Sequence, residues 1–202
     1  MTPTRSIFGV FLAVLLAVAA VHAGDVSRQQ ADSFAKKVAI ITQRGAGAPL
    51  PPSTPRRTAL SETELNSWFA YRAGSLIPNG ITEPRITIVG NGKVMGLATL
   101  DLEAYGKSRQ SKGGSGLWDL LGGHVPVSIE GVLTTKAGKG SFNLERATLG
   151  GLPVPKPFLQ ELVSYYSRSQ DHPDGVSIDA PFSLPARIQQ IDVAPGQAIV
   201  VQ

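Results

Sequence analysis

The side chains that most often carry out chemistry in proteins are few in this sequence of 202 residues. There is no cysteine, so the chain forms neither disulfides nor thiolate metal sites. Beyond the first 23 residues the only histidines are His124 and His172, in different turns rich in glycine or proline. A metal site would normally require three converging ligands. We therefore predict no metal site and interpret both histidines as exposed turn residues.

Three short fragments imitate catalytic or nucleotide-binding motifs. Ser33 and Lys36 have the Ser-x-x-Lys spacing of penicillin-recognising enzymes, but the later elements of that motif come in the wrong order. Gly106-Lys107-Ser108 matches the end of a phosphate-binding loop, although Asp101 stands where the first glycine is required. Ser115 lies in a glycine-rich loop that lacks the second glycine of a nucleophile elbow. We interpret all three as coincidences.

Paired carboxylates could serve as a general acid and a general base. The candidate pairs all lie at turns or at the ends of elements: Glu62 with Glu64, Asp101 with Glu103, and Asp171 with Asp174. Carboxylates at such positions usually cap helices or are solvated. A hidden acid pair across a cleft is the basis of one alternative function, a cryptic hydrolase. We predict no catalytic residue and no cofactor.

The first 23 residues have the order of a secretory signal peptide. Arg5 supplies one positive charge, Ile7 to Val21 are apolar residues and glycine without interruption, and Ala23 ends a triplet of the cleavage type. The apolar run is shorter than the roughly 20 residues that span a bilayer. We predict cleavage after Ala23 and export of a soluble protein to the periplasm or the outside of the cell.

The charge of the chain limits its partners. The formal net charge is +4, and the basic residues are spread along the sequence. Nucleic-acid binding would favour a concentrated basic stripe with interleaved aromatic residues, so we exclude nucleic acid as a partner. The mild basic excess is compatible with an anionic membrane surface.

The chain is expected to divide into a helix, a linker and one domain after the signal peptide. Residues 24–44 are predicted to form a helix, because Ala31, Phe34, Val38 and Ile41 recur at helical spacing. Residues 45–58 contain four prolines and two glycines and are predicted to be a linker. Residues 59–202 are predicted to be a single α+β domain.

Hairpins dominate the predicted domain. It opens with a capping box at Ser61 and Glu64, which predicts a short helix. Alternating apolar residues then predict hairpins over 85–102, 125–149 and 188–201. Together these strands predict a curved antiparallel sheet of about six strands.

One further helix interrupts the hairpins. Proline and glycine at 150–157 break the sheet and lead into a helix that ends at about Arg168. Its apolar residues occupy more than half of its circumference: Phe158, Leu159, Leu162, Val163, Tyr165 and Tyr166. A helix of this kind is expected to be covered on more than one side, as it would be inside a bent sheet. The sheet is therefore predicted to wrap around this apolar helix.

This organisation resembles small exported lipid-binding proteins related to the tubular lipid-binding superfamily. The resemblance covers residues 58–202 and is carried by the Leu-Ser-x-x-Glu-Leu-Asn helix entry at 60–66, the hairpins, and Gly-Leu-Pro-x-Pro at 151–155 before the apolar helix. It implies a bent antiparallel sheet on a long helix, with an apolar groove that takes acyl chains. No motif in this chain is specific enough to transfer a head-group site.

The residues themselves predict either a packed core or a groove between the sheet and the helix. The candidate lipid-binding residues are Ile129, Leu133, Phe142, Leu144, Phe158, Leu162 and Tyr165. A membrane-facing rim is predicted from residues suited to an interface: Trp68, Lys107, Arg109, Lys112 and Trp118. The three basic residues lie in a segment, 107–116, that we expect to be a mobile loop.

The leading hypothesis is a non-enzymatic envelope protein that binds a lipid or another amphiphile in an apolar groove and docks on an anionic membrane. The alternative is a structural or assembly module, in which an exposed edge strand or the linker binds an envelope protein. The cryptic hydrolase is the third hypothesis.

Overall fold

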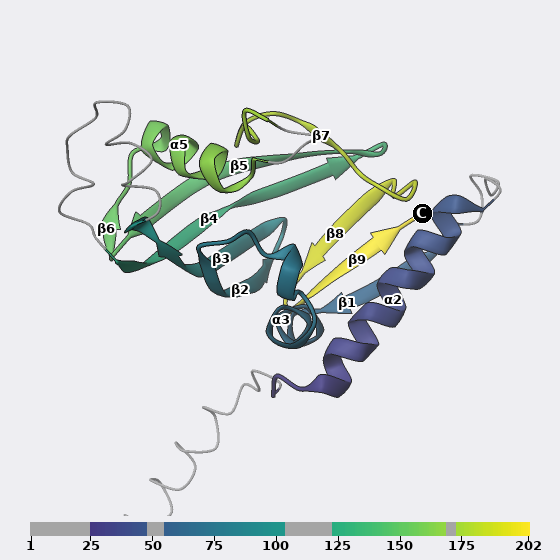
Figure 1. Ribbon diagram of the computed structural model, residues 1–202. Helices are drawn as coiled ribbons and strands as arrows, with labels where there is room; N and C mark the ends of the chain where they lie inside the picture. Colours follow the sequence, from purple (N-terminus) through teal and green to yellow (C-terminus); the bar gives the residue numbers. More distant parts are fainter. Residues whose placement is uncertain (1–24, 48–54, 104–122, 169–172) are drawn as a thin grey trace, which may run out of the picture.

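The computed structural model describes residues 25–47, 55–103, 123–168 and 173–202. Within these residues the chain forms three α-helices, a six-stranded antiparallel sheet and a separate three-stranded sheet (Figure 1). The predicted α+β class, with an antiparallel sheet of about six strands and an N-terminal helix, is confirmed. No helix in the described ranges has the length and apolar character needed to cross a bilayer. The predicted signal peptide, 1–23, lies outside the described residues, as do residues 48–54 of the predicted linker.

Helix α2 spans Arg28–Ala46 and so starts and ends slightly later than predicted. Its start is fixed by Ser27, whose hydroxyl accepts a hydrogen bond from the backbone N–H of Gln30 at 3.2 Å. Ala31, Phe34 and Ile41 are buried, which is the apolar stripe expected from helical spacing. The stripe is covered by helix α3 and by the three-stranded sheet.

Helix α3, Glu62–Tyr71, begins with the predicted capping box. The Ser61 hydroxyl accepts from the Glu64 N–H, and the Glu64 carboxylate accepts from the Ser61 N–H. The helix packs on α2 through Phe34 and Trp68, whose ring centroids are 5.6 Å apart. A 3-10 turn, η1 (Gly74–Leu76), follows it.

The large sheet has the strand order β2-β3-β4-β5-β6, with β7 also paired to β5. The strands are β2 Ile81–Gly90, β3 Lys93–Asp101, β4 His124–Lys136, β5 Lys139–Leu149, β6 Leu152–Pro153 and β7 Phe182–Ser183. Two of the predicted hairpins are β2–β3 and β4–β5. The turns between these strands contain glycine with positive φ at Gly92 and Gly138, a conformation that glycine adopts without steric cost.

The small sheet pairs the first strand of the described chain with its last hairpin. Its strands are β1 Arg57–Ser61, β8 Gln190–Ala194 and β9 Gln197–Val201, in the order β1-β9-β8. The β8–β9 pair is the predicted closing hairpin. Strand β1 was not predicted. It takes in the last two residues of the predicted linker and pairs antiparallel with β9, from Arg57 opposite Val201 to Ser61 opposite Gln197.

Helix α5, Lys156–Tyr166, lies across β4 and β5 (Figure 1). Pro155 and Pro157 start it at no cost in hydrogen bonds, because the first helical N–H groups have no partner within the helix. Leu159 and Leu162 are each 2 % exposed. Leu162 belongs to the main core cluster with Leu100, Leu102, Val125, Val127 and Leu149. The core therefore lies between this helix and the large sheet.

The outer edge of β2 is occupied by polar groups from other elements. The Asn66 side chain donates to the Ile86 carbonyl and accepts from the Ile86 N–H, both at 2.8 Å. Glu62 accepts from the N–H of Ile88 at 2.7 Å, and the N–H of Gly196 donates to the Ile88 carbonyl at 2.8 Å. These bonds satisfy backbone groups that would otherwise be a template for another strand.

Candidate functional site

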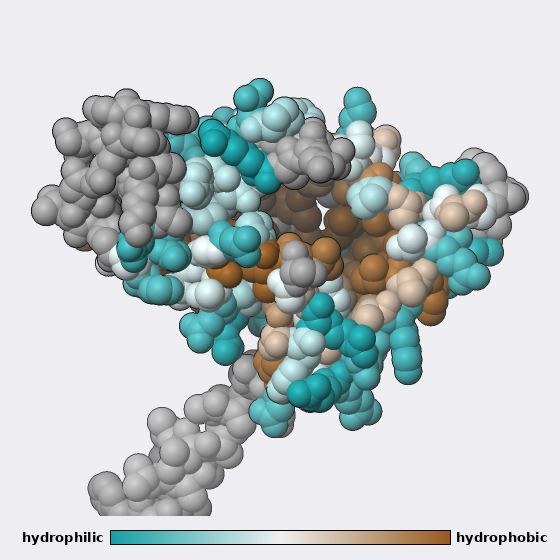
Figure 2. All heavy atoms as spheres, in the orientation of Figure 1, coloured by the Kyte–Doolittle hydropathy of each residue, from teal (hydrophilic) through white to brown (hydrophobic). Residues whose placement is uncertain are grey.

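A pocket of about 750 Å³ lies between the large sheet and helix α5. Ile129 of β4 and Phe142 and Leu144 of β5 form one side, and Leu159 and Val163 of α5 form another. The third side is residues 175–183, which we call the strap. On this side of the molecule hydrophobic residues gather in a hollow between α5 and the small sheet (Figure 2). A volume of this size is typical of small-molecule pockets, which range from about 300 to 1,000 Å³.

The apolar floor follows from strand alternation, since successive side chains of a strand point to opposite faces. Ile129 faces the pocket, whereas its neighbour Glu130 lies on the other face, where its carboxylate is 2.6 Å from Lys93 Nζ. Hydrogen bonding to Glu130 and Glu145 raises the pKa of Lys93, and the hydrogen bond from Lys93 lowers the pKa of Glu130. One face of the sheet is therefore charged and the other is apolar.

Gly131 makes room for the ring of Phe142 on the pocket floor. A Cβ atom at Gly131 would lie 2.5 Å from Cζ of Phe142 and 2.4 Å from the carbonyl oxygen of Asn143. Gly131 is also where the β4–β5 register shifts, between the pairs Glu130–Arg146 and Gly131–Leu144. The irregularity changes which residues of β5 face α5.

Side chains of α5 and of its C-cap residue hold the strap through hydrogen bonds to the strap backbone. Gln160 Nε2 donates to the Val176 carbonyl at 2.9 Å, and Gln160 Oε1 accepts from the Ile178 N–H at 2.8 Å. Ser167 Oγ accepts from the Val176 N–H, also at 2.8 Å. Gln160 thus acts on the strap as a neighbouring strand would, with one donor and one acceptor.

Two further contacts fix the course of the strap. Gly175, at φ +80°, passes so close to α5 that a Cβ atom there would lie 2.1 Å from the Ser164 carbonyl oxygen. Asp179 forms an exposed ion pair with Lys156 at 2.6 Å. The far end of the strap becomes β7, which pairs with Lys139 and Gly140 of β5. The strap is therefore anchored on both the helix and the sheet.

The structure brings three of the seven predicted lipid-binding residues to this pocket: Ile129, Phe142 and Leu144. Leu162 lies in the main core, and Tyr165 packs against that core. Leu133, opposite Phe142 in the β4–β5 register, is half-buried and is not part of the lining. Phe158 is 36 % exposed in the first turn of α5.

The predicted membrane-facing rim is described only at Trp68. Its indole is half-buried in the contact between α2 and α3, next to Phe34 and Phe69. The other predicted rim residues, Lys107, Arg109, Lys112 and Trp118, lie outside the described residues. A rim that docks on an anionic membrane stays a prediction.

Sequence reasoning missed most of the strap and part of the helix wall. Leu159 and Val163 are four residues apart, and Val176 and Ile178 two apart, so helical and strand spacing were both present as signals. Those signals did not show that the segment after α5 folds back over it. That return depends on Gln160, Ser167 and the pairing of β7, which are not local in sequence.

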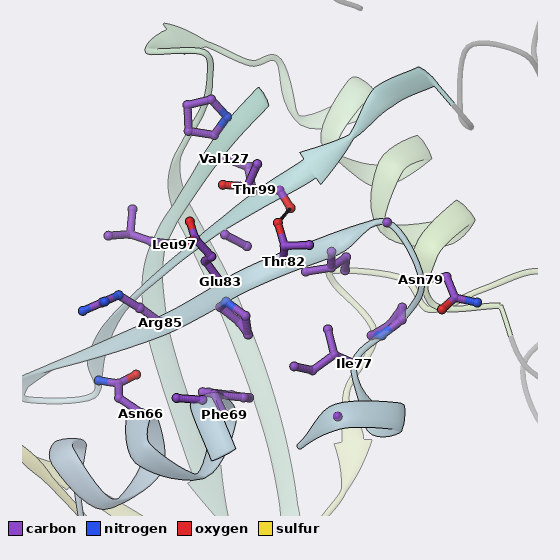
Figure 3. A pocket seen from close by; sticks show the side chains of 18 of the residues that line it. Asn66, Phe69, Ile77, Asn79, Thr82, Glu83, Arg85, Leu97, Thr99 and Val127 are labelled. Atoms are coloured by element: carbon purple, nitrogen blue, oxygen red, sulfur yellow. Dashed lines mark hydrogen bonds between the residues drawn. The ribbon is translucent and has the colours of Figure 1, made fainter. Parts of the chain in front are cut away.

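A second cavity, of about 860 Å³, lies between α3, η1 and strands β2 and β3 (Figure 3). Its lining includes Glu83 and Arg85 of β2, at a bulge where Glu83 adopts φ +51°. Asn66, which also lines it, already bonds to the β2 backbone. This cavity is larger than the first but more polar, and it contains none of the seven predicted lipid-binding residues.

The motif-like Ser33 takes part in a structural cluster with a different lysine. Ser33 Oγ donates to Glu64 at 2.6 Å, and Lys37 Nζ lies 2.7 Å from the same carboxylate. Burial alone would raise the pKa of Glu64, but hydrogen bonds from Lys37, Ser33 and the Ser61 N–H outweigh burial and lower that pKa. Through these contacts with Glu64, the cluster connects α2 to α3.

The other candidate catalytic residues in the described ranges either bond to backbone N–H groups or are exposed. Glu62 and Glu64 bond to the backbone N–H groups of Ile88 and Ser61, and Asp101 accepts from the Glu103 N–H at 3.0 Å. His124 is exposed at the start of β4. His172, Asp171, Ser115 and Gly106-Lys107-Ser108 lie outside the described residues.

Comparison of this chain with known protein families, with curated proteins and with solved structures found no match. The resemblance to tubular lipid-binding proteins therefore stays a prediction from sequence.

Proposed function

We propose that this protein is a non-enzymatic carrier or receptor that holds the hydrocarbon part of a lipid or another amphiphile in the pocket beneath the strap. One observation carries the proposal: the pocket has an apolar floor, Ile129, Phe142 and Leu144, opposite an apolar helix wall, Leu159 and Val163. Transfer of hydrocarbon from water to such a lining is favourable by about 25 cal/mol per Å² of apolar surface.

The arrangement of the strap supports this assignment. The strap is held by side-chain hydrogen bonds and by the two-residue strand β7. It can therefore separate from α5 with the loss of fewer hydrogen bonds than a strand in the middle of a sheet would lose. It therefore offers a route by which a long guest enters between the strap and α5. Val176 and Phe182, which line the pocket, are 42 % and 43 % exposed, and a bound chain would cover them.

Export to the cell envelope is part of the proposal and rests on the N-terminal sequence. The order of one basic residue, Arg5, an apolar run and the Ala23 cleavage position is typical of a secretory signal peptide. An amphiphile carrier outside the cytoplasm would operate where membrane lipids are accessible.

Native mass spectrometry of the protein purified from its own envelope tests the proposal. We expect a fraction of the protein to carry a mass adduct that extraction with organic solvent identifies as an amphiphile. Protein stripped of lipid is then offered extracted envelope lipids. No adduct before stripping and no uptake afterwards would contradict the proposed function.

A further inference from the structure

We infer that the pocket beneath the strap takes an amphiphile whose hydrocarbon is joined to an extended chain of secondary amides, that is, an N-acylated peptide. The inference rests on the proposed function and specifies the ligand class of the same site. It is carried by a stretch of β5 at the pocket floor, where outward backbone groups have no hydrogen-bond partner among the described residues.

Two short strands cover the outer edge of β5 at its ends and leave its middle uncovered. β6 pairs with residues 148–149 and β7 with residues 139–140 (Figure 1). The Val154 N–H adds one bond at the β6 end, to the Ala147 carbonyl at 3.0 Å. No strand in the described ranges pairs with the outer edge of residues 141–146.

The register of β5 assigns the uncovered groups to Phe142 and Leu144. In antiparallel pairing, alternate residues direct both of their backbone groups to the same neighbouring strand. The Leu184 N–H donates to the Gly138 carbonyl at 2.8 Å, so Gly138 and every second residue after it face the outer edge. The β4–β5 register continues without a shift as far as Leu144. The N–H and C=O of Phe142 and the N–H of Leu144 therefore point away from β4, and no group in the described ranges bonds to them.

These backbone groups belong to two residues of the apolar pocket floor. A hydrocarbon chain that covers Phe142 and Leu144 displaces water from the strand edge and offers no hydrogen bond in return. An ester adds an acceptor but no donor for the Phe142 carbonyl. A secondary amide supplies one donor and one acceptor, and successive amides of an extended chain repeat at the spacing of a β-strand. An acylated peptide therefore satisfies both the floor and the edge.

The chain blocks other strand edges with its own side chains. Asn66 and Glu62 bond to the outward backbone groups of β2. The Thr135 hydroxyl bonds to both the N–H and the C=O of Ile191 at the edge of β8. The β5 edge is open where the strap and α5 form a pocket beside it. Addition of an extended peptide to an open sheet edge is a common mode of recognition.

The guest would occupy the gap between β6 and β7. Its peptide part would lie along β5 as one more strand, and its acyl chain would fill the space between Ile129 and Val163, which line the pocket from the sheet and from α5.

Three probes test this ligand class on the natural protein, stripped of lipid. They are N-decanoyl tetra-alanine amide, the same molecule with every backbone amide N-methylated, and N-acetyl tetra-alanine amide. N-methylation removes the donors and retains the hydrocarbon and the carbonyls. Titrations followed by native mass spectrometry give the three affinities. We expect the decanoyl probe to bind at least about tenfold more tightly than either control.

Amide hydrogen exchange, resolved by residue with nuclear magnetic resonance, locates the contact. Exchange at Phe142 and Leu144 should slow when the decanoyl probe is added and should change little with its N-methylated analogue. Ser141 and Asn143 are the internal reference, because their N–H groups face β4.

A pair of variants tests the strand edge from the side of the protein. Phe142→Pro removes the outward N–H and leaves the bonds to β4 in place, as proline does at a sheet edge. Phe142→Leu is the matched control, since it also loses the ring but keeps the N–H. We expect Phe142→Pro to bind the decanoyl probe several-fold more weakly than Phe142→Leu does, and the two variants to bind the N-methylated probe alike. If Phe142→Pro does not fold, the exchange measurement on the natural protein decides the inference.

The outcomes separate this inference from the proposed function. Equal binding of the decanoyl probe and its N-methylated analogue, or unchanged exchange at Phe142 and Leu144, would overturn the ligand class and leave the carrier proposal intact. Equally tight binding of the acetyl probe would overturn both and would favour a peptide partner without an acyl chain. Binding of no probe, together with no uptake of envelope lipid, would also overturn both.

Discussion

The ring of Phe182 lies against the backbone of Gly140, so closely that a Cβ atom at Gly140 would be 2.6 Å from the ring Cζ atom. The two residues are also directly opposite each other in the β5–β7 register. Glycine leaves the backbone of β5 open, and the ring covers it. This contact fixes the sheet end of the strap, and Gln160 fixes the helix end.

Replacement of Gly140 should release β7 from the sheet. In Gly140→Ala the new methyl group meets the Phe182 ring, and overpacking of this kind costs about 1–3 kcal/mol. We expect a lower melting temperature and faster hydrogen exchange at residues 182–184. The double variant Gly140→Ala with Phe182→Leu should recover part of the loss, because the smaller side chain leaves room for the methyl group. Unchanged exchange in Gly140→Ala would show that the ring contact does not hold the strap.

Gln160 provides a test of the helix end of the strap. Gln160→Glu keeps the acceptor for the Ile178 N–H but loses the donor to the Val176 carbonyl, and Gln160→Ala loses both. Each lost bond contributes about 0.5–1.5 kcal/mol. We expect hydrogen exchange at Ile178 to accelerate most in Gln160→Ala. The contrast is Lys156→Ala, which removes only an ion pair whose side chains are 48 % and 62 % exposed and should change exchange little.

A large side chain in the pocket should block amphiphile uptake without unfolding the protein. Val163 is half-buried on the helix wall, and Val163→Trp would occupy much of the space above Ile129. We expect loss of the lipid adduct in native mass spectrometry, with the far-ultraviolet circular dichroism spectrum retained. Val89→Trp, at a position 44 % exposed on β2 and outside the pocket, is the matched control and should bind as the natural protein does.

The Glu64 cluster predicts a specific dependence of stability on pH. The pKa of Glu64 is lowered in the folded protein from its ordinary value of 4.5. The stabilisation is therefore complete above about pH 4.5 and is lost as the pH falls through the lower, folded-state pKa. Glu64→Gln should lower the free energy of unfolding by about 1–3 kcal/mol at pH 7 and should weaken its dependence on pH below 4.5. Denaturant unfolding from pH 3 to pH 7 measures both effects.

The control for this titration is Asp174→Asn, which removes an exposed carboxylate and leaves the Glu64 cluster intact. If Glu64→Gln had the same acid unfolding curve as the natural protein, the cluster would not be the source of that dependence.

Asn66 should protect the edge of β2 from intermolecular pairing. Asn66→Ala frees both backbone groups of Ile86 that the side chain now satisfies. Freed edge groups can pair with a second chain. We expect concentration-dependent association, measured by light scattering during size-exclusion chromatography, and faster exchange at Ile86. Asn66→Asp, which retains the acceptor only, should show an intermediate effect, whereas a strictly monomeric Asn66→Ala protein would assign the edge no such role.

Local patterns in the sequence predicted the elements that depend on local interactions. The capping box at Ser61 and Glu64, the β4–β5 hairpin and the N-terminal helix were all recognisable from spacing and turn residues. Strand β1 was missed because its five residues become a strand only by pairing with β9. No turn or alternating run near residue 57 indicates that partner.

The candidate site was predicted only in part, because local spacing identifies an apolar face but not what that face contacts. Alternation in β4 and β5 identified Ile129, Phe142 and Leu144 as one apolar face. The spacing of apolar residues in α5 did not distinguish Leu162, which lies in the core, from Val163, which lines the pocket. Likewise, the sequence motif paired Ser33 with Lys36. In the structure Lys37, one helical turn from Ser33, is the lysine that binds the same carboxylate, Glu64, as Ser33 does.

The pairing of β1 with β9 sets the order in which this chain can complete its fold. Ile41 of the N-terminal helix packs with Ile188 and Val200, so that part of the helix has no cover until the final hairpin has been made. Closure across so long a separation is slow compared with formation of a local hairpin. Strand β1 and the Ile41 end of helix α2 therefore stay uncovered until β8 and β9 have formed.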